Sequence, residues 1–166
     1  MADVHAAGGC AYGTETMHVL RAEKGYIIVG QDTDGTVTPH DAGLSWAVGK
    51  KKEDFVGIRG LLRPDLVAPG RRQLIGLNSV DGTKVLEEGA QRVESPAKGP
   101  PHGIIGWVSS SYWSENCSAP IAMALLEGGF DRMGDRLFAS AADDGFIEVE
   151  VCDPVFYDRE GAKQNG

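Results

Sequence analysis

Hydrophobic and polar residues alternate along the second half of the chain with the two-residue period of β-strands. The clearest case is 146–151, FIEVEV, where valine and glutamate alternate as in a strand with one buried face. Other short apolar runs, separated by glycine, proline and aspartate, recur through this half. A small antiparallel barrel or closed sandwich would leave none of these strands with an open edge. The expected strands are 73–77, 90–94, 104–110, 121–126 and 146–151.

The first half of the chain carries helix signals instead. Thr14 is expected to cap a helix, because its hydroxyl can accept a bond from an unpaired first-turn amide. Glu15 follows it, and a negative charge suits the first turn. Met17 and Leu20 lie three residues apart and predict an apolar stripe. Gly25 can take the left-handed conformation that ends a helix, so we expect a helix over 14–24.

Three further elements are expected before residue 70. Residues 26–29 are rich in β-branched side chains and predict a short strand, which an acidic, glycine-containing turn at 30–35 follows. Thr38 and Pro39 predict the cap and first residue of a short helix, where the missing N–H of proline costs nothing. Residues 53–66 predict a helix with one apolar face. That face would carry Phe55, Ile58, Leu61 and Leu62, and Pro64 would end the helix.

The pattern changes near Pro69 and Gly70, which divides the chain. We therefore expect an α+β fold, with a short helical or α/β segment followed by a small antiparallel β-barrel. The expected segments are a flexible start at 1–11, the α/β segment at 12–69, the barrel at 70–158 and a tail at 159–166.

Composition and charge exclude several classes of partner. The 166 residues suffice for a buried core, but the net charge of -8 opposes binding to nucleic acid, which requires a concentrated basic face. The basic clusters at 50–52 and 71–72 are short and fit solvated loops. No apolar run approaches the roughly 20 residues of a membrane span. The first residues, MADVH, have neither a basic region nor a long apolar segment, so no secretory signal is expected. We expect a cytoplasmic protein with neither a nucleic-acid nor a membrane partner.

The motifs that would indicate a metal site, a nucleotide site or a hydrolase do not occur in the sequence. The widely spaced Cys10, Cys117 and Cys152 form no CxxC pair, and the histidines show no HxxxH spacing, so no metal site is expected. The glycines form neither GxGxxG nor GxxxxGK[ST], and no serine lies in a GxSxG elbow. The residues by themselves therefore assign no catalytic group.

Two clusters and the isolated Trp46 remain as candidates for a binding site, and Trp46 taken by itself would be interpreted as a core residue. Asp32, Asp34 and Asp41 partly match a calcium loop, but the glycine comes too early and no glutamate closes the loop, which favours a tight turn. Tyr112 and Trp113 follow three serines and fit either the rim of a ligand site or a turn whose rings cover the core. The turn is the favoured interpretation of this second cluster.

Four stretches of the chain resemble a known family. They are LRAEKGYIIVGQDTDGTVTPHDAGLSWAV at 20–48, GWVSS at 106–110, IAMAL at 121–125 and PVFYD at 154–158. Together they resemble the folate-binding aminomethyltransferases, which include the T-protein of the glycine cleavage system. The sequence of these stretches is most similar to the C-terminal part of the alpha subunits of heterotetrameric sarcosine oxidases. The resemblance covers 12–157 and implies that 12–69 is part of a folate-binding segment and 70–158 its C-terminal barrel.

The resemblance also implies roles for particular residues. Tyr26 and Trp46 fall at positions that line the pterin channel, where flat rings could stack on a pterin. Arg21 and Glu23 match the helix that reads R-L-E in the family and are expected to tie that helix to its neighbours. Met17 departs from the aminomethyltransferases, which carry a folate-binding arginine there. This departure puts aminomethyl transfer in doubt and fits the sarcosine oxidases.

The function that follows from the resemblance is a contribution to tetrahydrofolate binding, as the C-terminal fragment of a sarcosine oxidase alpha subunit. In the family the catalytic aspartate lies upstream of the matched segment, so the chain is expected not to catalyse alone. The complete complex would oxidise sarcosine to glycine and a one-carbon unit, with FAD, FMN and NAD expected only there. The expected partners are other sarcosine oxidase subunits, or a second copy through an exposed incomplete face. The alternatives are a structural or subunit-interaction module and a small folate-dependent aminomethyltransferase.

Overall fold

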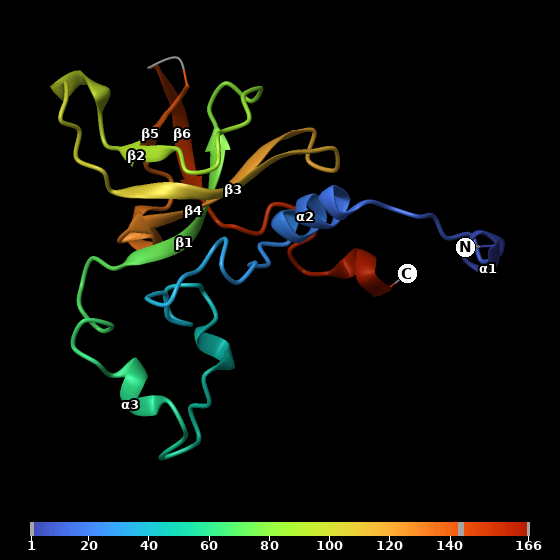
Figure 1. Ribbon diagram of the computed structural model, residues 1–166, viewed down its shortest axis with the longest axis horizontal. Helices are drawn as coiled ribbons and strands as arrows, with labels where there is room; N and C mark the ends of the chain where they lie inside the picture. The colour runs from blue at the N-terminus through green and yellow to red at the C-terminus, as the bar shows by residue number, and fades with distance from the viewer. Residues whose placement is uncertain (1, 143–144, 166) are drawn as a thin grey trace.

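Six antiparallel strands close into a β-barrel in the second half of the chain (Figure 1). The computed structural model describes residues 2–142 and 145–165. Around the barrel the strand order is β1-β4-β3-β2-β5-β6, and β6 pairs with β1 to close it. The strands are β1 Arg72–Ser79, β2 Gln91–Val93, β3 Gly106–Ser114, β4 Ala119–Glu127, β5 Arg136–Ser140 and β6 Phe146–Cys152. The expected α+β chain with a small antiparallel barrel is confirmed.

Alternation along the strands sorts the apolar side chains into two clusters. An inner cluster fills the barrel, and an outer cluster lies between the barrel wall and the N-terminal segment. In β4, for example, Ala122, Ala124 and Leu126 belong to the inner cluster, whereas the residues between them belong to the outer one. The inner cluster is Ile75, Leu77, Leu86, Ala90, Val108, Ala122, Ala124, Leu126, Leu137, Ala139, Val149 and Val151. The outer cluster is Ala22, Leu74, Tyr112, Ile121, Met123 and Leu125.

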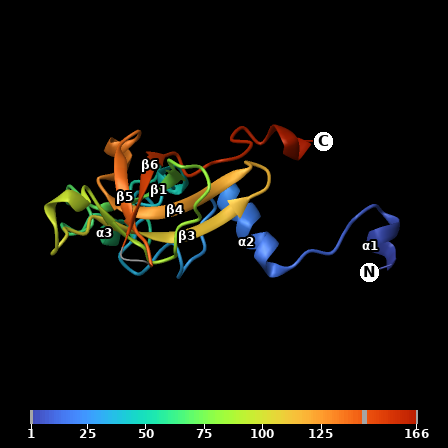
Figure 2. The ribbon, with the colours of Figure 1, turned by 90° about the horizontal axis from the view of Figure 1, so that it is seen from above.

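Helix α2, Thr14–Glu23, packs on the outside of the barrel against β3 and β4, as Figures 1 and 2 both show. The short helix α1, Ala2–Ala6, lies away from the barrel at the end of an extended linker. The other helices are α3 Ile58–Leu61 and the 3-10 turns η1 Ser45–Ala47, η2 Pro96–Lys98, η3 Gly129–Arg132 and η4 Ala162–Asn165. None of the helices within 2–142 and 145–165 is both long enough and apolar enough to cross a membrane.

The five expected strands appear as β1, β2, β3, β4 and β6, with ends displaced by a few residues. Strand β5 was not expected. Its five residues, RLFAS, alternate too briefly to stand out, with only Leu137 and Ala139 fully buried. The barrel nevertheless requires it, because β5 is the strand that joins β2 to β6.

The expected helix at 14–24 is confirmed as α2, but two of its details are wrong. Gly13 occupies the cap position without any side-chain bond, and Thr14 is the first helical residue. Met17 and Leu20 are 47% and 45% exposed, so they form no buried stripe. The helix instead buries its C-terminal end, where Ala22 enters the outer cluster.

The strand expected at 26–29 is absent from the structure. Only an isolated bridge joins Val29 to Thr33, because the chain reverses at once into the acidic turn. A strand needs a partner for its backbone hydrogen bonds, and no strand of the barrel runs beside this segment. The helix expected after Thr38 is a turn over 39–43, which ends where Gly43 takes φ of +73°.

The helix expected over 53–66 is also wrong, since only the four residues of α3 are helical there. Gly57 precedes α3 with φ of +99°, a left-handed conformation that cannot belong to a right-handed helix. Gly60 and Pro64 lower the helical tendency further. The apolar spacing alone therefore overstated the helix.

Candidate functional site

Asp32 lies at the centre of the acidic turn, is fully buried, and joins the N-terminal segment to the barrel. Its Oδ2 accepts hydrogen bonds from the guanidinium of Arg21 and, at 2.8 Å, from the amide of Ile28. Its Oδ1 accepts from the hydroxyls of Ser109 and Ser110 at 2.5 and 2.6 Å. Both oxygens are therefore paired, as burial of a carboxylate requires.

A β-bulge explains why two consecutive serines reach one carboxylate. In the pairing of β3 with β4, the register shifts between Val108 and Ser110. Successive side chains of a regular strand point to opposite faces, whereas the extra residue of a bulge breaks that alternation. Ser109 and Ser110 can therefore both donate to Asp32.

Arg21, which lies in α2, connects the network around Asp32 to Tyr26. Its Nη2 donates to the hydroxyl of Ser110 at 2.6 Å, and its Nη1 donates to the carbonyl oxygen of Tyr26 at 3.2 Å. The guanidinium also lies 5.8 Å from the ring centroid of Tyr112. The side-chain amide of Gln31 donates to Ser110 at 3.2 Å. Helix, turn and barrel strand thus share one set of hydrogen bonds.

Glu23 makes a second buried connection between α2 and the barrel. Its carboxylate accepts from the hydroxyl of Ser114 at 2.6 Å and from the amide of Asn116 at 2.8 Å. Its backbone oxygen accepts from the amides of Phe156 and Tyr157 at 2.9 and 3.0 Å. The segment that follows β6 is therefore held against the end of α2.

Asp41 and Arg71 tie the turn at 39–43 to the start of β1. The Nη2 of Arg71 lies 2.6 Å from Oδ2 of Asp41, and the Asp41 backbone oxygen accepts from the amide of Leu74 at 2.7 Å. Burial alone would raise the pKa of the Asp41 carboxyl, but hydrogen bonds from Arg71 and Thr38 outweigh it and lower that pKa. Asp32 and Asp41 are thus each paired with an arginine.

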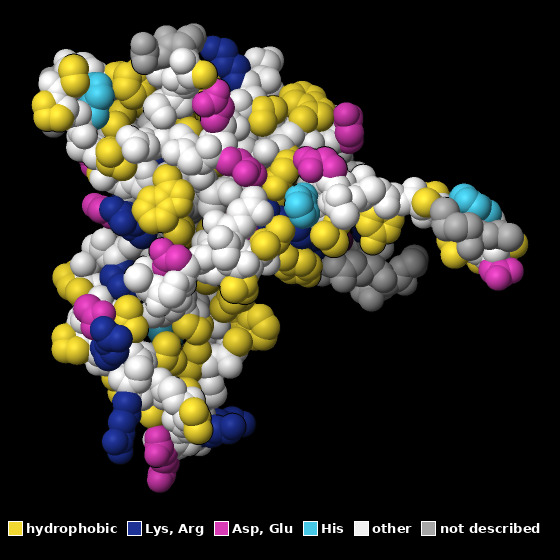
Figure 3. Space-filling model, in the orientation of Figure 1, with side chains coloured by type: hydrophobic (Ala, Val, Ile, Leu, Met, Phe, Trp, Pro, Cys, Tyr) yellow, Lys and Arg dark blue, Asp and Glu magenta, His cyan; other side chains and the backbone are white. Residues whose placement is uncertain are grey.

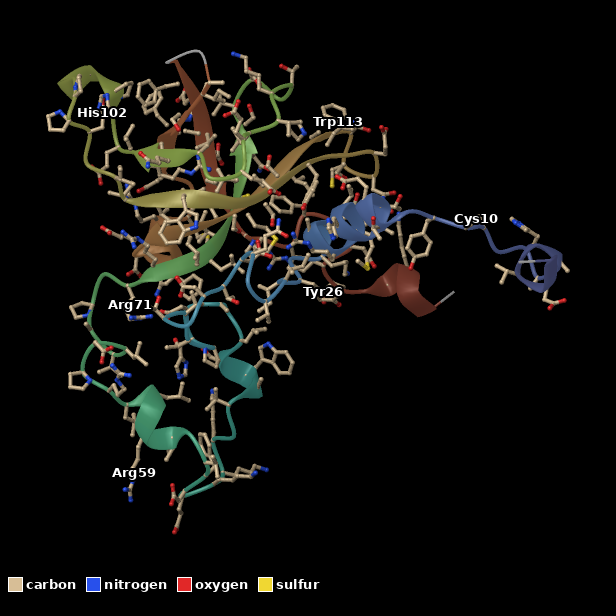
Figure 4. The ribbon with its side chains drawn as sticks, viewed as in Figure 1. Cys10, Tyr26, Arg59, Arg71, His102 and Trp113 are labelled. Carbon is tan, nitrogen blue, oxygen red and sulfur yellow. The ribbon has the colours of Figure 1, made fainter. Side chains whose placement is uncertain are left out.

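Tyr26 and Trp46 present their rings to solvent, with exposed fractions of 60% and 78%. Tyr26 follows Gly25, whose φ of +68° turns the chain at the end of α2, and its amide donates to the carbonyl of Arg21 at 2.9 Å. Figure 4 shows Tyr26 below α2, outside the barrel. Trp46 lies in η1. The structure joins Arg21 to Tyr26 directly, whereas no ring contact joins Tyr26 to Trp46 within the described part of the chain.

The sequence pattern places Asp32 in a turn and does not reveal its role as a buried ion-pair partner. The same pattern places Ser109 and Ser110 beside a possible ligand rim and does not reveal that both donate to Asp32. A residue far along the chain decides each of these contacts, since Asp32 and Ser109 are separated by 77 positions. The only sequence signal was the occurrence of polar residues inside an apolar strand, in WVSSSYW. Tyr112 proves buried within β3, and Trp113 is 41% exposed there, so neither lies in a turn.

A shallow polar cavity of about 270 Å³ lies where the acidic turn meets the barrel. On its wall, the guanidinium of Arg72 stacks 4.9 Å from the ring centroid of Trp107 and pairs with Glu127 at 3.3 Å. No group of three or more histidine, cysteine, aspartate or glutamate side chains is placed to hold a metal within 2–142 and 145–165.

The two halves of the chain match two parts of one family. Residues 1–52 match the GCVT N-terminal domain, and residues 72–158 match the glycine cleavage T-protein C-terminal barrel domain. The second match coincides with the six-stranded barrel. The chain belongs to the glycine cleavage T-protein family.

Curated members of this T-protein family share the sequence at substantial identity. The sarcosine oxidase subunit alpha of Corynebacterium sp. (strain U-96) is 46% identical over 99% of this chain, which spans 17% of that protein. The aminomethyltransferase of Nitrosomonas europaea is 35% identical over 76% of this chain and 33% of its own length. The chain therefore spans only about a sixth to a third of the length of these relatives.

A solved structure shows the same T-protein fold. The aminomethyltransferase T of the glycine cleavage system from Bartonella henselae superposes with a TM-score of 0.79, over 94% of this chain and 42% of that chain. At 24% sequence identity this likeness establishes the fold alone.

Proposed function

We propose that this chain forms one wall of a tetrahydrofolate site that serves the oxidative demethylation of sarcosine to glycine and a one-carbon unit. Its 46% identity to a sarcosine oxidase alpha subunit supports this function more than a free-standing aminomethyltransferase. In the proposed arrangement FAD, FMN and NAD act elsewhere in the complete complex. The partners would be the other subunits of that complex, in the cytoplasm.

The observation that carries the proposal is that Tyr26 and Trp46 expose their rings on a segment that hydrogen bonds hold against the barrel. A ring that stacks on a pterin must be accessible and held in place. Tyr26 and Trp46 are exposed, and the backbone of Tyr26 is bonded to Arg21 in both directions. Arg21 is in turn held by Asp32. The proposed role of Asp32 is therefore to position the wall and not to touch the ligand.

The proposed division of labour follows the same reasoning. The segment 12–69 would present the ligand-facing rings, and the barrel at 70–158 would act as their rigid support. Glu23 would fix the far end of α2 through Ser114 and Asn116. No residue of this chain is assigned to the chemical step, so the chain is proposed to bind but not to catalyse.

Tryptophan fluorescence with added tetrahydrofolate tests this proposal, in the chain alone and in the assembled sarcosine oxidase complex. Trp46→Leu should weaken folate binding in the complex, whereas Trp113→Leu, a matched change at an exposed tryptophan of β3, should leave it unchanged. The isolated chain should bind weakly or not at all, because it supplies one wall. Equal folate affinity of the complex with and without Trp46 would refute the role given to this ring. Submicromolar binding by the isolated chain would refute the incomplete site.

A second candidate function is a subunit-interaction module. Large exposed apolar side chains are concentrated before residue 70. Figure 3 shows apolar atoms on the lower part of the molecule, where α3 lies, and also along the arm that carries α1 and α2. The exposed side chains include Met17, Leu20, Tyr26, Val29, Trp46, Val56, Leu62 and Val67. Such a surface is typical of one that another protein covers. Light scattering that shows a strict monomer at high concentration, together with no binding to other sarcosine oxidase subunits, would exclude this function.

A further inference from the structure

Arg92 is an arginine on the inside of the barrel. It lies in β2, directly opposite Gly106 of β3 and Ala139 of β5. Directly opposed residues of antiparallel strands point to the same face, and Ala139 belongs to the inner cluster. The side chain of Arg92 is fully buried and therefore projects into the apolar interior.

The guanidinium of Arg92 has no partner among residues 2–142 and 145–165. Its Nε, Nη1 and Nη2 make no hydrogen bond with any of these residues, and their accessible surface is negligible. The alanine, valine, leucine and isoleucine side chains of the inner cluster cannot accept a hydrogen bond. Burial lowers the pKa of Arg92 to about 9, which still leaves the group protonated at neutral pH.

The other well-covered arginines among the described residues each have a carboxylate partner, which sets Arg92 apart. Arg21 is paired with Asp32, Arg71 with Asp41, and Arg132 with Glu94 and Asp135. For Arg21 and Arg71 the carboxylate comes from the N-terminal segment, on the outside of the barrel. Arg92 faces the opposite side of the wall, where the N-terminal segment does not reach.

We propose that Arg92 binds a small monovalent anion inside the barrel, of the size of chloride or formate. A buried guanidinium without a counter-charge is strongly unfavourable, and its planar set of five N–H donors is suited to an anion. The anion would be small because aliphatic side chains pack the interior, and monovalent because one cation faces it. This site is separate from the proposed folate wall, since Tyr26 and Trp46 lie outside the barrel.

Thermal unfolding of this chain in different sodium salts at constant ionic strength tests the proposal. Chloride and formate should raise the Tm of the unmodified chain in a saturable way, relative to gluconate, which is too large to enter the barrel. Arg92→Met should abolish this anion-specific shift, because it removes the charge and keeps an unbranched side chain. Arg72→Met is the matched control: Arg72 is half exposed on the outside of the barrel, so its removal should leave the shift intact.

A crystal grown in bromide gives an independent readout that needs no variant. An anomalous peak within hydrogen-bonding distance of the Arg92 guanidinium is expected. The proposal is overturned if the unmodified chain shows no anion-specific shift, or if Arg92→Met retains it. If Arg92→Met does not fold, the bromide crystal decides, and the absence of a peak beside Arg92 refutes the site. Folate binding is not involved in either experiment, so failure here would leave the proposed function untouched.

Discussion

Replacing Asp32 by asparagine should destabilise the fold far more than its position in a surface-like acidic turn suggests. Asp32 is fully buried, and its carboxylate accepts from Arg21, Ile28, Ser109 and Ser110. Asparagine keeps one acceptor oxygen but places an NH₂ donor against other donors. It also leaves the nearly buried guanidinium of Arg21 without its counter-charge.

Removing one partner of a buried ion pair costs about 3–5 kcal/mol of unfolding free energy, because the remaining charge stays buried. For a chain of this size, 1 kcal/mol corresponds to a change in Tm of about 2–4 °C. Asp32→Asn should therefore lower the Tm by roughly 6–20 °C. Urea unfolding should show the same loss as a lower midpoint with an unchanged slope.

Asp34→Asn is the matched control, two residues along the same turn. Asp34 is exposed, and its side chain accepts from the amide and hydroxyl of Thr36 at 2.7 Å, which asparagine can also do. We expect this variant to change stability by about 0.5 kcal/mol or less. In a double-mutant cycle, adding Arg21→Met to Asp32→Asn should recover part of the loss. If Asp32→Asn is no less stable than Asp34→Asn, the buried network contributes nothing and the reasoning is refuted.

Three further predictions concern other parts of the chain. The pKa of the Asp41 carboxyl is lowered in the folded state from its usual 3.8, so its ionised form stabilises the fold above pH 3.8. This stability is lost as the pH falls through the folded pKa, and Asp41→Asn should therefore make the unfolding free energy depend less on pH below about 4 in an acid titration. Burial raises the pKa of Cys152 to about 12, so iodoacetamide at pH 8 should modify the exposed Cys10 first and Cys152 last, as peptide mass spectrometry would show; rapid labelling of Cys152 would contradict this. A Cβ at Gly106 would overlap a backbone carbonyl of β4, whereas a Cβ at Gly103 would meet nothing. Gly106→Ala should therefore lower the free energy of unfolding in urea by at least about 1–3 kcal/mol, and Gly103→Ala should leave it unchanged. Equal stability of the two variants would argue against this packing.

The barrel was largely predictable because its information is local. Strand β6 alternates over 147–151, and the two-residue period places valines inside and glutamates outside. Strand β5 escaped prediction because a five-residue strand carries few alternations, and only the need to join β2 to β6 identifies it. The helix at 53–66 was overestimated because its apolar spacing was local, while the left-handed Gly57 was not visible in the pattern.

The candidate site was predictable only in part. The resemblance singled out Arg21, Glu23, Tyr26 and Trp46, and the assignment of the last two as pterin-facing rings stays a prediction. The exposure of these two rings and the pairing of Arg21 with Asp32 emerged from the folded chain. The hydrogen bonds from Ser109 and Ser110 to Asp32 depend on a bulge in β3. A bulge arises from the pairing of two strands and so cannot be predicted from the sequence of one strand.

By itself the sequence determined the family, the α+β class, the barrel and the net negative charge. These properties follow from residue order, period and charge, which are readable without contacts. Tertiary structure alone decided that Asp32 is a buried ion-pair partner and that Arg92 is a buried cation with no partner in the described part of the chain. The physical reason is that burial and counter-charge depend on neighbours tens of residues away, so a polar residue's environment is known only once the barrel has closed.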